Sequence, residues 1–191
     1  MTVANKRMAM NGIGSSVRSE LDFYTTDPHS VELLMESEVG YLLKGPVWEP
    51  ACGNGHISKE LARHGYCVRS SDIVMRDYPC ETLNFLECTE SFNGDIVTNP
   101  PFKHAEEFVR EALELAYPGR IVAFFMKLTF LEGVHRRKLF DRFPPKYVYV
   151  SSKRLSCCPG GRVDGPKLRA VAYAWFVWEN GCRNETVVRW I

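Results

Sequence analysis

A strand that runs directly into two prolines is the feature that most limits how this chain can fold. Residues 95–98 read Asp-Ile-Val-Thr, and Asn99-Pro100-Pro101-Phe102 follows at once. Proline has no N–H group to donate, so the hydrogen bonds of a β-sheet must stop at this point. The residue before a proline is also held in an extended conformation. We therefore expect Asn99 to project from the carboxyl end of a strand, where open α/β sheets bind ligands.

A glycine-rich turn upstream predicts a second part of the same crevice. Residues 46–49 form a short apolar strand, and Ala51-Cys52-Gly53-Asn54-Gly55 leads from it into a helical pattern. Glycines let the backbone approach a ligand beside a helix N-terminus. Asp72 ends the next strand, where a carboxylate can accept hydrogen bonds from two ribose hydroxyls. The turn favours a nucleotide-type cofactor over a purely structural turn, and Ser58 stands where a nicotinamide fingerprint has a third small residue.

Strands and helices alternate along most of the chain, which favours a single α/β domain with a mostly parallel sheet. We expect one antiparallel strand near the end, helices on both faces of the sheet, a loose polar tail at 1–20 and the domain at 21–191. A long loop rich in glycine, proline and basic residues is expected at 152–169. The expected helices are 28–42, 56–64, 103–117 and 134–143. The seven expected strands are 46–49, 66–71, 82–86, 95–98, 121–126, 146–151 and 171–178.

Composition excludes several classes of protein. No apolar run approaches the ~20 residues that cross a bilayer, and the N-terminus lacks the apolar stretch of a secretory signal. The sequence has seven cysteines, an odd number, and no Cys-x-x-Cys motif, so we expect neither a disulfide framework nor a zinc site. A cytoplasmic protein with reduced thiols and no metal is the expectation.

Charge is divided unevenly along the chain. The net charge is +1, but residues 1–117 hold 10 basic and 18 acidic side chains, whereas residues 118–191 hold 14 and 5. Such a chain can present one basic face to a polyanion, although a run of charges can also be only a solvated face. The loop at 152–169 is expected near the mouth of the crevice. Its candidate phosphate ligands are Lys153, Arg154, Arg162, Lys167 and Arg169.

The Asn-Pro-Pro-Phe stretch has a chemical interpretation of its own, besides the alternative that it is only a strand-ending turn. The Asn99 side-chain oxygen and the Pro100 carbonyl offer two acceptors to one exocyclic NH2 group. An aromatic amine is a poor nucleophile because its lone pair is delocalised into the ring. Accepting both N–H groups localises that lone pair on the nitrogen, and Phe102 can stack on the base. We expect Asn99, Pro100, Pro101 and Phe102 to form the catalytic segment.

Five stretches in this order resemble the motifs of S-adenosylmethionine-dependent N6-adenine DNA methyltransferases. They are residues 23–27, 49–55, 72, 84–86 and 99–102, and the resemblance covers roughly residues 22–180. The order is that of the gamma group, and small phage-type adenine methylases are the most similar. The resemblance implies a class I methyltransferase fold of the Rossmann-like type, S-adenosylmethionine as cofactor, adenine-containing DNA as partner, and a bacterial or phage-infected cell.

Roles for individual residues also follow from the resemblance. It implies that Asp72 holds the cofactor's ribose and that Ile73 packs on its adenine. Asn84 departs from the aspartate that is usual there, so we expect weaker cofactor binding. Asn99 belongs to both the catalytic and the cofactor set. The implied cofactor residues are Tyr24, Thr25, Thr26, Glu49, Ala51, Gly53, Gly55, Asp72, Ile73, Asn84, Phe85 and Asn99.

Other functions stay open at the level of sequence. The same motif serves enzymes that methylate adenine N6 in RNA or a glutamine amide in a protein, although such glutamine methylases typically carry Tyr at the position of Phe102. A catalytically silent cofactor-binding subunit is a further alternative. No separate target-recognition region is evident, which implies loose specificity, a very short target, or help from a second subunit or a homo-oligomer.

Overall fold

The computed structural model describes residues 24–155, 157–159, 171–183 and 185–191. The expected tail at 1–20 lies outside the described residues, and so do Arg162, Lys167 and Arg169. No helix among the described residues is long and apolar enough to cross a membrane.

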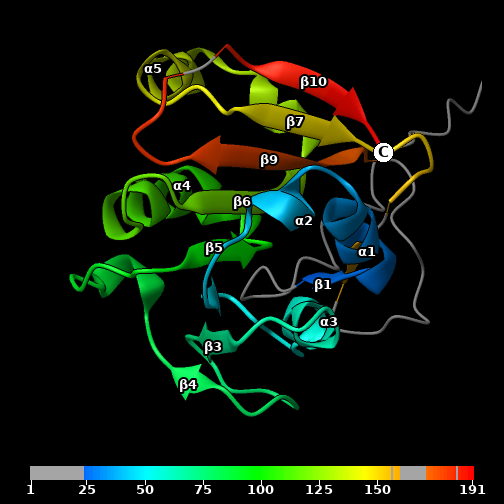
Figure 1. The fold of residues 1–191 in the computed structure, drawn as a ribbon, viewed down its shortest axis with the longest axis vertical. Helices are drawn as coiled ribbons and strands as arrows, with labels where there is room; N and C mark the ends of the chain where they lie inside the picture. Colours follow the sequence, from blue (N-terminus) through cyan, green and yellow to red (C-terminus); the bar gives the residue numbers. More distant parts are fainter. Residues whose placement is uncertain (1–23, 156, 160–170, 184) are drawn as a thin grey trace, which may run out of the picture.

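The centre of the molecule is a sheet of eight strands in the order β10-β7-β9-β6-β5-β2-β3-β4 (Figure 1). Only β9 runs antiparallel to its neighbours, β6 and β7, while all other neighbouring pairs are parallel. The strands are β2 (Val47–Glu49), β3 (Val68–Asp72), β4 (Glu81–Thr82), β5 (Asp95–Thr98), β6 (Ile121–Lys127), β7 (Tyr147–Val150), β9 (Tyr173–Glu179) and β10 (Val187–Trp190). The mostly parallel sheet with one antiparallel strand is confirmed. The expected count of seven strands is wrong, because β10 adds an eighth beside β7.

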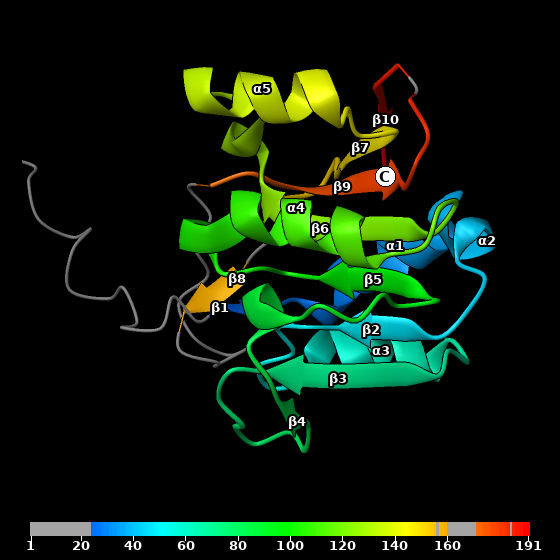
Figure 2. The same ribbon diagram turned by 90° about the vertical axis from the view of Figure 1, so that its left-hand side faces the viewer.

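Helices cover both faces of this sheet, as expected (Figures 1 and 2). One face carries α1 (Pro28–Glu36), α2 (Val39–Leu42) and α3 (His56–Arg63), and the other carries α4 (Ala105–Leu115) and α5 (Val134–Arg142). The first helix was expected to continue to residue 42, but it ends at Glu36, with Ser37 as its C-terminal cap. The Ser37 hydroxyl donates to the Leu34 carbonyl and accepts from the Val39 N–H, which replaces helical backbone bonds.

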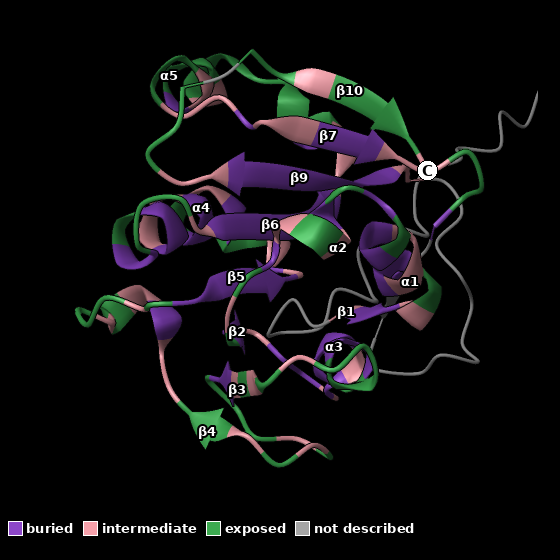
Figure 3. Cartoon of the chain, viewed as in Figure 1, coloured by how far each residue is buried: buried purple, intermediate pink, exposed green. Residues whose placement is uncertain are grey.

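The apolar strand β6 lies between the two layers of helices. Its first six residues are buried, and β9 beside it is buried to the same extent (Figure 3). Side chains at alternate positions enter opposite cores, with Val122 and Phe124 on the α4 side and Ala123 and Phe125 on the α1 side. The uninterrupted apolar run therefore formed the central strand that the sequence predicts.

A second, two-stranded sheet departs from the prediction. β1 (Tyr24–Thr26) pairs antiparallel with β8 (Cys157–Pro159), so Thr26 lies opposite Cys157. Residues 157–159 were expected to be part of a loop. The strand expected at 82–86 is also wrong beyond Thr82, because Asn84 caps a short 3-10 helix, η1 (Phe85–Glu87), by accepting a hydrogen bond from the Leu86 N–H. Two further 3-10 helices are η2 (Phe102–His104) and η3 (Leu128–Leu131).

The glycine turn shows why its second glycine is needed. Gly55 has a φ of 71° and stands at the N-terminal cap of α3. A Cβ atom at this position would lie 2.3 Å from Cγ of the Tyr78 ring. Both the left-handed backbone and the close approach of the ring require the absence of a side chain.

We predict that Gly55→Ala lowers the free energy of unfolding by at least ~2 kcal/mol, because it adds a clash to the strain of a left-handed alanine. Gly65→Ala is the matched control. Gly65 has a φ of 89° and nothing within 4 Å of the added Cβ, so only the strain of ~1 kcal/mol is expected. Urea unfolding measures both values. Equal losses in the two variants would show that the Tyr78 contact is unimportant.

Candidate active site

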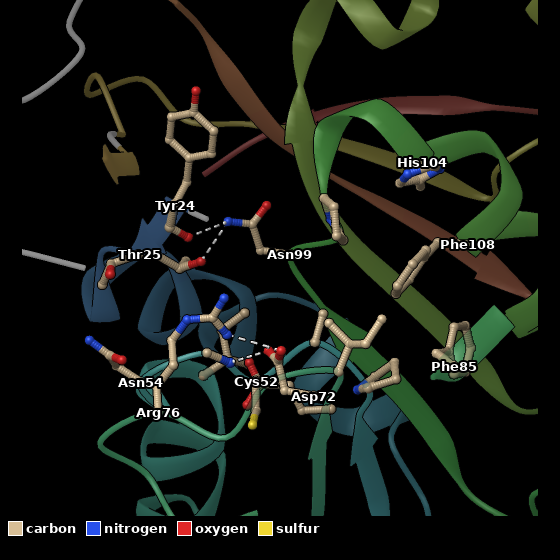
Figure 4. Close-up of a pocket in the computed structure, with 18 of the residues that line it drawn as sticks. Tyr24, Thr25, Cys52, Asn54, Asp72, Arg76, Phe85, Asn99, His104 and Phe108 are labelled. Carbon is tan, nitrogen blue, oxygen red and sulfur yellow. Dashed lines mark hydrogen bonds and ion pairs between the residues drawn. The ribbon is translucent and has the colours of Figure 1, made fainter. Parts of the chain in front are cut away.

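The carboxyl ends of β2, β3 and β5 open on one cavity of about 410 Å³ (Figure 4). These strands are parallel, so residues that follow each of them meet at one edge of the sheet. The cavity brings together most of the residues predicted to bind the cofactor or the amine. Those that line it are Tyr24, Thr25, Thr26, Glu49, Ala51, Gly53, Asp72, Ile73, Asn84, Phe85, Asn99 and Pro101.

Three predicted residues do not line this cavity, namely Gly55, Pro100 and Phe102. Gly55 shapes the turn instead, as described above. Pro100 is buried. The Phe102 ring packs 4.7 Å from the ring of Tyr24 and 5.8 Å from that of Tyr173, and Lys127 Nζ lies 4.1 Å from its centre. Aromatic and cationic neighbours therefore already contact the ring that was predicted to stack on a base.

Glu49 ends β2 and is 1% exposed. Its carboxyl group accepts a hydrogen bond from the Ser58 N–H at 2.7 Å and another from the Ser58 hydroxyl. Burial raises the pKa of Glu49 to about 8, the charge of Asp72 adds to the rise, and the bonds from Ser58 oppose it. Ser58, the residue that departs from a nicotinamide fingerprint, thus connects the first turn of α3 to β2.

Asp72 ends β3 and lies against the glycine turn. Its Oδ2 accepts from the Gly53 N–H at 2.8 Å, and its Oδ1 accepts from the Val74 N–H at 3.1 Å. Arg76 forms an ion pair with the same Oδ1 at 3.0 Å, and its guanidinium lies between Asp72 and Asn54 in Figure 4. A carboxylate at this position is the predicted ribose ligand, and the guanidinium beside it is an additional cavity residue.

One wall of the cavity is apolar. Phe85 is 2% exposed, its ring packs 5.0 Å from that of Phe108, and Leu83 and Leu86 lie in the same wall. Asn84 stands beside them with both ends of its amide engaged, because Nδ2 donates to Glu87 and Oδ1 accepts from the Leu86 N–H. A flat aromatic ring would fit such a wall.

Asn99 projects from the carboxyl end of β5 into the cavity, as the two prolines predict. Its Nδ2 donates to Thr26 Oγ1 at 2.9 Å and to the Tyr24 carbonyl at 3.3 Å. Its Oδ1 is buried and has no hydrogen-bond partner among the described residues. A buried acceptor without a partner costs free energy unless a ligand supplies a donor. The arrangement suits a ligand that brings an N–H or O–H group to this atom.

The expected basic flank is described only in part. Lys153 and Arg154 are exposed and follow the carboxyl end of β7, which lies at the same edge of the sheet as Asn99 because β7 is parallel to β6. Three residues after Arg154, β8 begins at Cys157, and Cys157 Sγ lies 3.7 Å from Asn99 Nδ2. Within the segment that follows β7, Cys157 therefore lies beside the site.

Several lining residues were missed by the sequence analysis, notably His56, Arg76 and Phe108. His56 starts α3, and its Nδ1 is buried without a partner among the described residues. Partial burial and the charge of Lys59 lower its pKa, so the ring is mostly neutral at pH 7. Arg76 follows Asp72 by four residues in a segment that is not helical, so the spacing gave no signal of the ion pair. Phe108 carried no signal, because its place in α4 is explained equally well by core packing.

Comparison with known proteins shows the fold. The sequence matches no protein-family model and no curated protein. A structure from Listeria monocytogenes assigned to the class I S-adenosylmethionine-dependent methyltransferases has a TM-score of 0.60 at 11% identity, with 95% of this chain and 68% of that chain covered. The type IIG restriction endonuclease BpuSI has a TM-score of 0.60 at 14% identity, covering 85% and 26%. A protein from Lactococcus lactis assigned to the hemolysins has a TM-score of 0.61 at 12% identity, covering 86% and 91%.

The chain therefore has the Rossmann-like fold of class I methyltransferases. The strand order agrees with this class, since the antiparallel β9 lies between β6 and β7 near one edge of the sheet.

The buried Glu49 predicts a pH dependence of stability. Its pKa is about 8 in the folded chain against an ordinary value of 4.5, so the folded state binds the proton more tightly than the unfolded state. The free energy of unfolding should therefore fall as the pH rises from about 5 to about 9. Over this pH interval, the free energy of unfolding of Glu49→Gln should fall by at least ~2 kcal/mol less than that of the wild type. Urea unfolding at pH 5, 7 and 9 measures the difference. Parallel pH profiles would show that Glu49 is ionised without cost.

Proposed function

We propose that this protein transfers a methyl group from S-adenosylmethionine to the N6 amino group of adenine in DNA. The single observation that carries the proposal is the Asn99 amide, whose Nδ2 is held by β1 while its buried Oδ1 has no partner among the described residues. This atom stands at the edge of a cavity whose other residues suit the cofactor. The resemblance of the motifs and the class I methyltransferase fold point the same way.

The residues of the cavity fit S-adenosylmethionine. Asp72 offers carboxylate oxygens to the ribose hydroxyls, and Arg76 beside it would have to share that carboxylate or rotate away. The apolar wall with Phe85 and Phe108 suits the adenine ring. Gly53 has no side chain, so the cofactor can come close to its backbone, which leaves room for the remainder of the cofactor. When bound, the cofactor supplies an activated methyl group on its sulfonium.

Asn99 would act on the amine that receives the methyl group. Oδ1 accepts one amine N–H, and the Pro100 carbonyl is the proposed acceptor of the other. Both acceptors draw the nitrogen lone pair out of conjugation with the ring. Because Asn99 is already fixed by Thr26 and Tyr24, little reorganisation is needed when the substrate arrives. The gain in rate then comes mainly from holding nitrogen and methyl group in line.

Nucleic acid is the proposed substrate because the edge around Asn99 carries cations. Lys153 and Arg154 are exposed at this edge, and Lys127 lies over the Phe102 ring. Phosphates need such cations, and a base that reacts at its amino group must leave the stack to reach a buried Asn99. A base entering beside Phe102 would displace Lys127, which could then contact a phosphate.

The first test of this function is Asn99→Ala. We expect transfer to fall at least ~100-fold, the scale of losing one oriented polar contact in a transition state. Cofactor affinity should change less than about threefold, because the amide faces the amine. Transfer of radiolabelled methyl groups to DNA and titration calorimetry of the cofactor measure the two quantities. Activity above a tenth of the wild type would exclude the assigned role.

The second test concerns nucleic acid. Replacing Lys153 and Arg154 together by Ala should weaken duplex binding about equally for all sequences, since phosphates carry no sequence information. The slope of log affinity against log salt should become shallower by about 1 to 2. Fluorescence anisotropy of a labelled duplex at several salt concentrations measures both effects.

The matched control replaces Lys44 and Arg183, which are exposed at the opposite edge of the sheet. That pair removes the same charge and should leave the slope unchanged. If the two double variants behave alike, only overall charge matters, and methylation of a protein amide becomes the better account.

A further inference from the structure

We propose that Thr26 is a positioning residue that anchors the Asn99 side-chain amide in the orientation set by the Tyr24 carbonyl. The catalytic consequence rests on the proposed function, whereas the geometry can be tested without it. Thr26 was predicted only to contact the cofactor, and it does line the cavity. Its hydroxyl, however, contacts Asn99, at 2.9 Å between Oγ1 and Nδ2.

The Asn99 amide is held by a different sheet from the one that carries Asn99. Asn99 follows β5 of the eight-stranded sheet, whereas the acceptors around Nδ2 belong to the two-stranded sheet β1–β8. The Tyr24 carbonyl lies at 3.3 Å and Cys157 Sγ at 3.7 Å. An amide NH2 has two hydrogens, so Thr26 and Tyr24 use both, and sulfur adds a weak third contact.

The Tyr24 carbonyl can only accept, so it allows one orientation of the amide, and the Thr26 hydroxyl anchors the amide in that orientation. If the amide rotated by 180°, Oδ1 would face the Tyr24 carbonyl, and two oxygen acceptors would repel each other. The NH2 group would then face the amine site, where it could not accept an N–H. The observed orientation leaves Oδ1, the buried atom without a described partner, toward the cavity. β1 therefore selects the reactive orientation.

Thr26 is better placed for this role than its neighbours. The Tyr24 acceptor is a backbone atom, so its contribution depends on where β1 lies and not on a side chain. Thr26 is 4% exposed and pairs in register with Cys157, which is fully buried, so water does not compete for the Asn99 donors. Asp27 follows directly and caps α1 by accepting from the His29 N–H, which anchors the end of β1. The hydroxyl is thus held at a fixed point.

The test compares Thr26→Val, which keeps the shape and removes the acceptor, with Thr26→Ser, which keeps the acceptor. We expect kcat for methyl transfer to fall about 10- to 100-fold in T26V, with the KM for the cofactor changed less than about threefold. T26S should retain at least a third of the wild-type kcat. Cys157→Ala should cost less than about threefold, because a sulfur acceptor is weak.

A second measurement reads the amide directly. The Asn99 side-chain resonances in a ¹⁵N–¹H correlation spectrum are identified by their absence in Asn99→Ala. In T26V these resonances should shift and exchange with solvent at least about tenfold faster, whereas in T26S they should stay near the wild-type positions. If T26V does not fold, Thr26→Ala takes its place in both measurements.

The outcomes separate the two proposals. The positioning role is overturned if the Asn99 amide of T26V keeps wild-type shifts and exchange, or if T26S loses as much kcat as T26V. It is also overturned if T26V raises the KM for the cofactor and leaves kcat unchanged, which would make Thr26 a cofactor contact alone. If the wild type methylates no substrate at all, the proposed function fails, while the amide resonances still decide the role of Thr26.

Discussion

The site depends on the absence of two N–H groups, those of Pro100 and Pro101. Without them β5 cannot extend its hydrogen bonds, so the chain leaves the sheet at Asn99 and presents that side chain at the carboxyl edge. Strands β2 and β3 are parallel to β5 and end at the same edge, which brings Glu49 and Asp72 to the same cavity. The missing N–H donors of two prolines thus place the amide beside the residues proposed to bind the cofactor.

Rigidity around this edge comes from the buried interior and from polar contacts that cross between elements. β6 and β9 contribute large side chains to both cores, whereas β4 and β10 form the two edges of the sheet. Ser58 joins α3 to β2 through Glu49, and Asp72 joins β3 to the glycine turn. The two-stranded sheet β1–β8 then holds the Asn99 amide, because Thr26 of β1 accepts a hydrogen bond from Nδ2. Charged and polar groups at this edge are oriented before any ligand arrives.

The sequence predicted those features that depend on neighbouring residues. Two prolines predicted the position of Asn99, and an apolar run predicted the central strand β6. Features that depend on contacts between distant segments were missed. Asn99 and Cys157 are 58 positions apart, and no local pattern indicates that 157–159 would pair with β1. The short 3-10 helix after Asn84 was missed because a capping amide outweighed the strand-like pattern of 82–86. The strand β10 was also missed. It pairs with β7 on the side away from β9, which is the strand that was expected to be the last.

The central claim is that Asn99 presents an acceptor to an exocyclic amine of adenine, and the identity of the methylated product tests it most directly. Purified protein would be incubated with isotopically labelled S-adenosylmethionine and with separate pools of DNA, RNA and protein, followed by digestion and mass spectrometry. The account predicts label in N6-methyladenine from DNA, absent when Asn99 is replaced by Ala. Label on a ring carbon, on an oxygen or on no pool at all would contradict it.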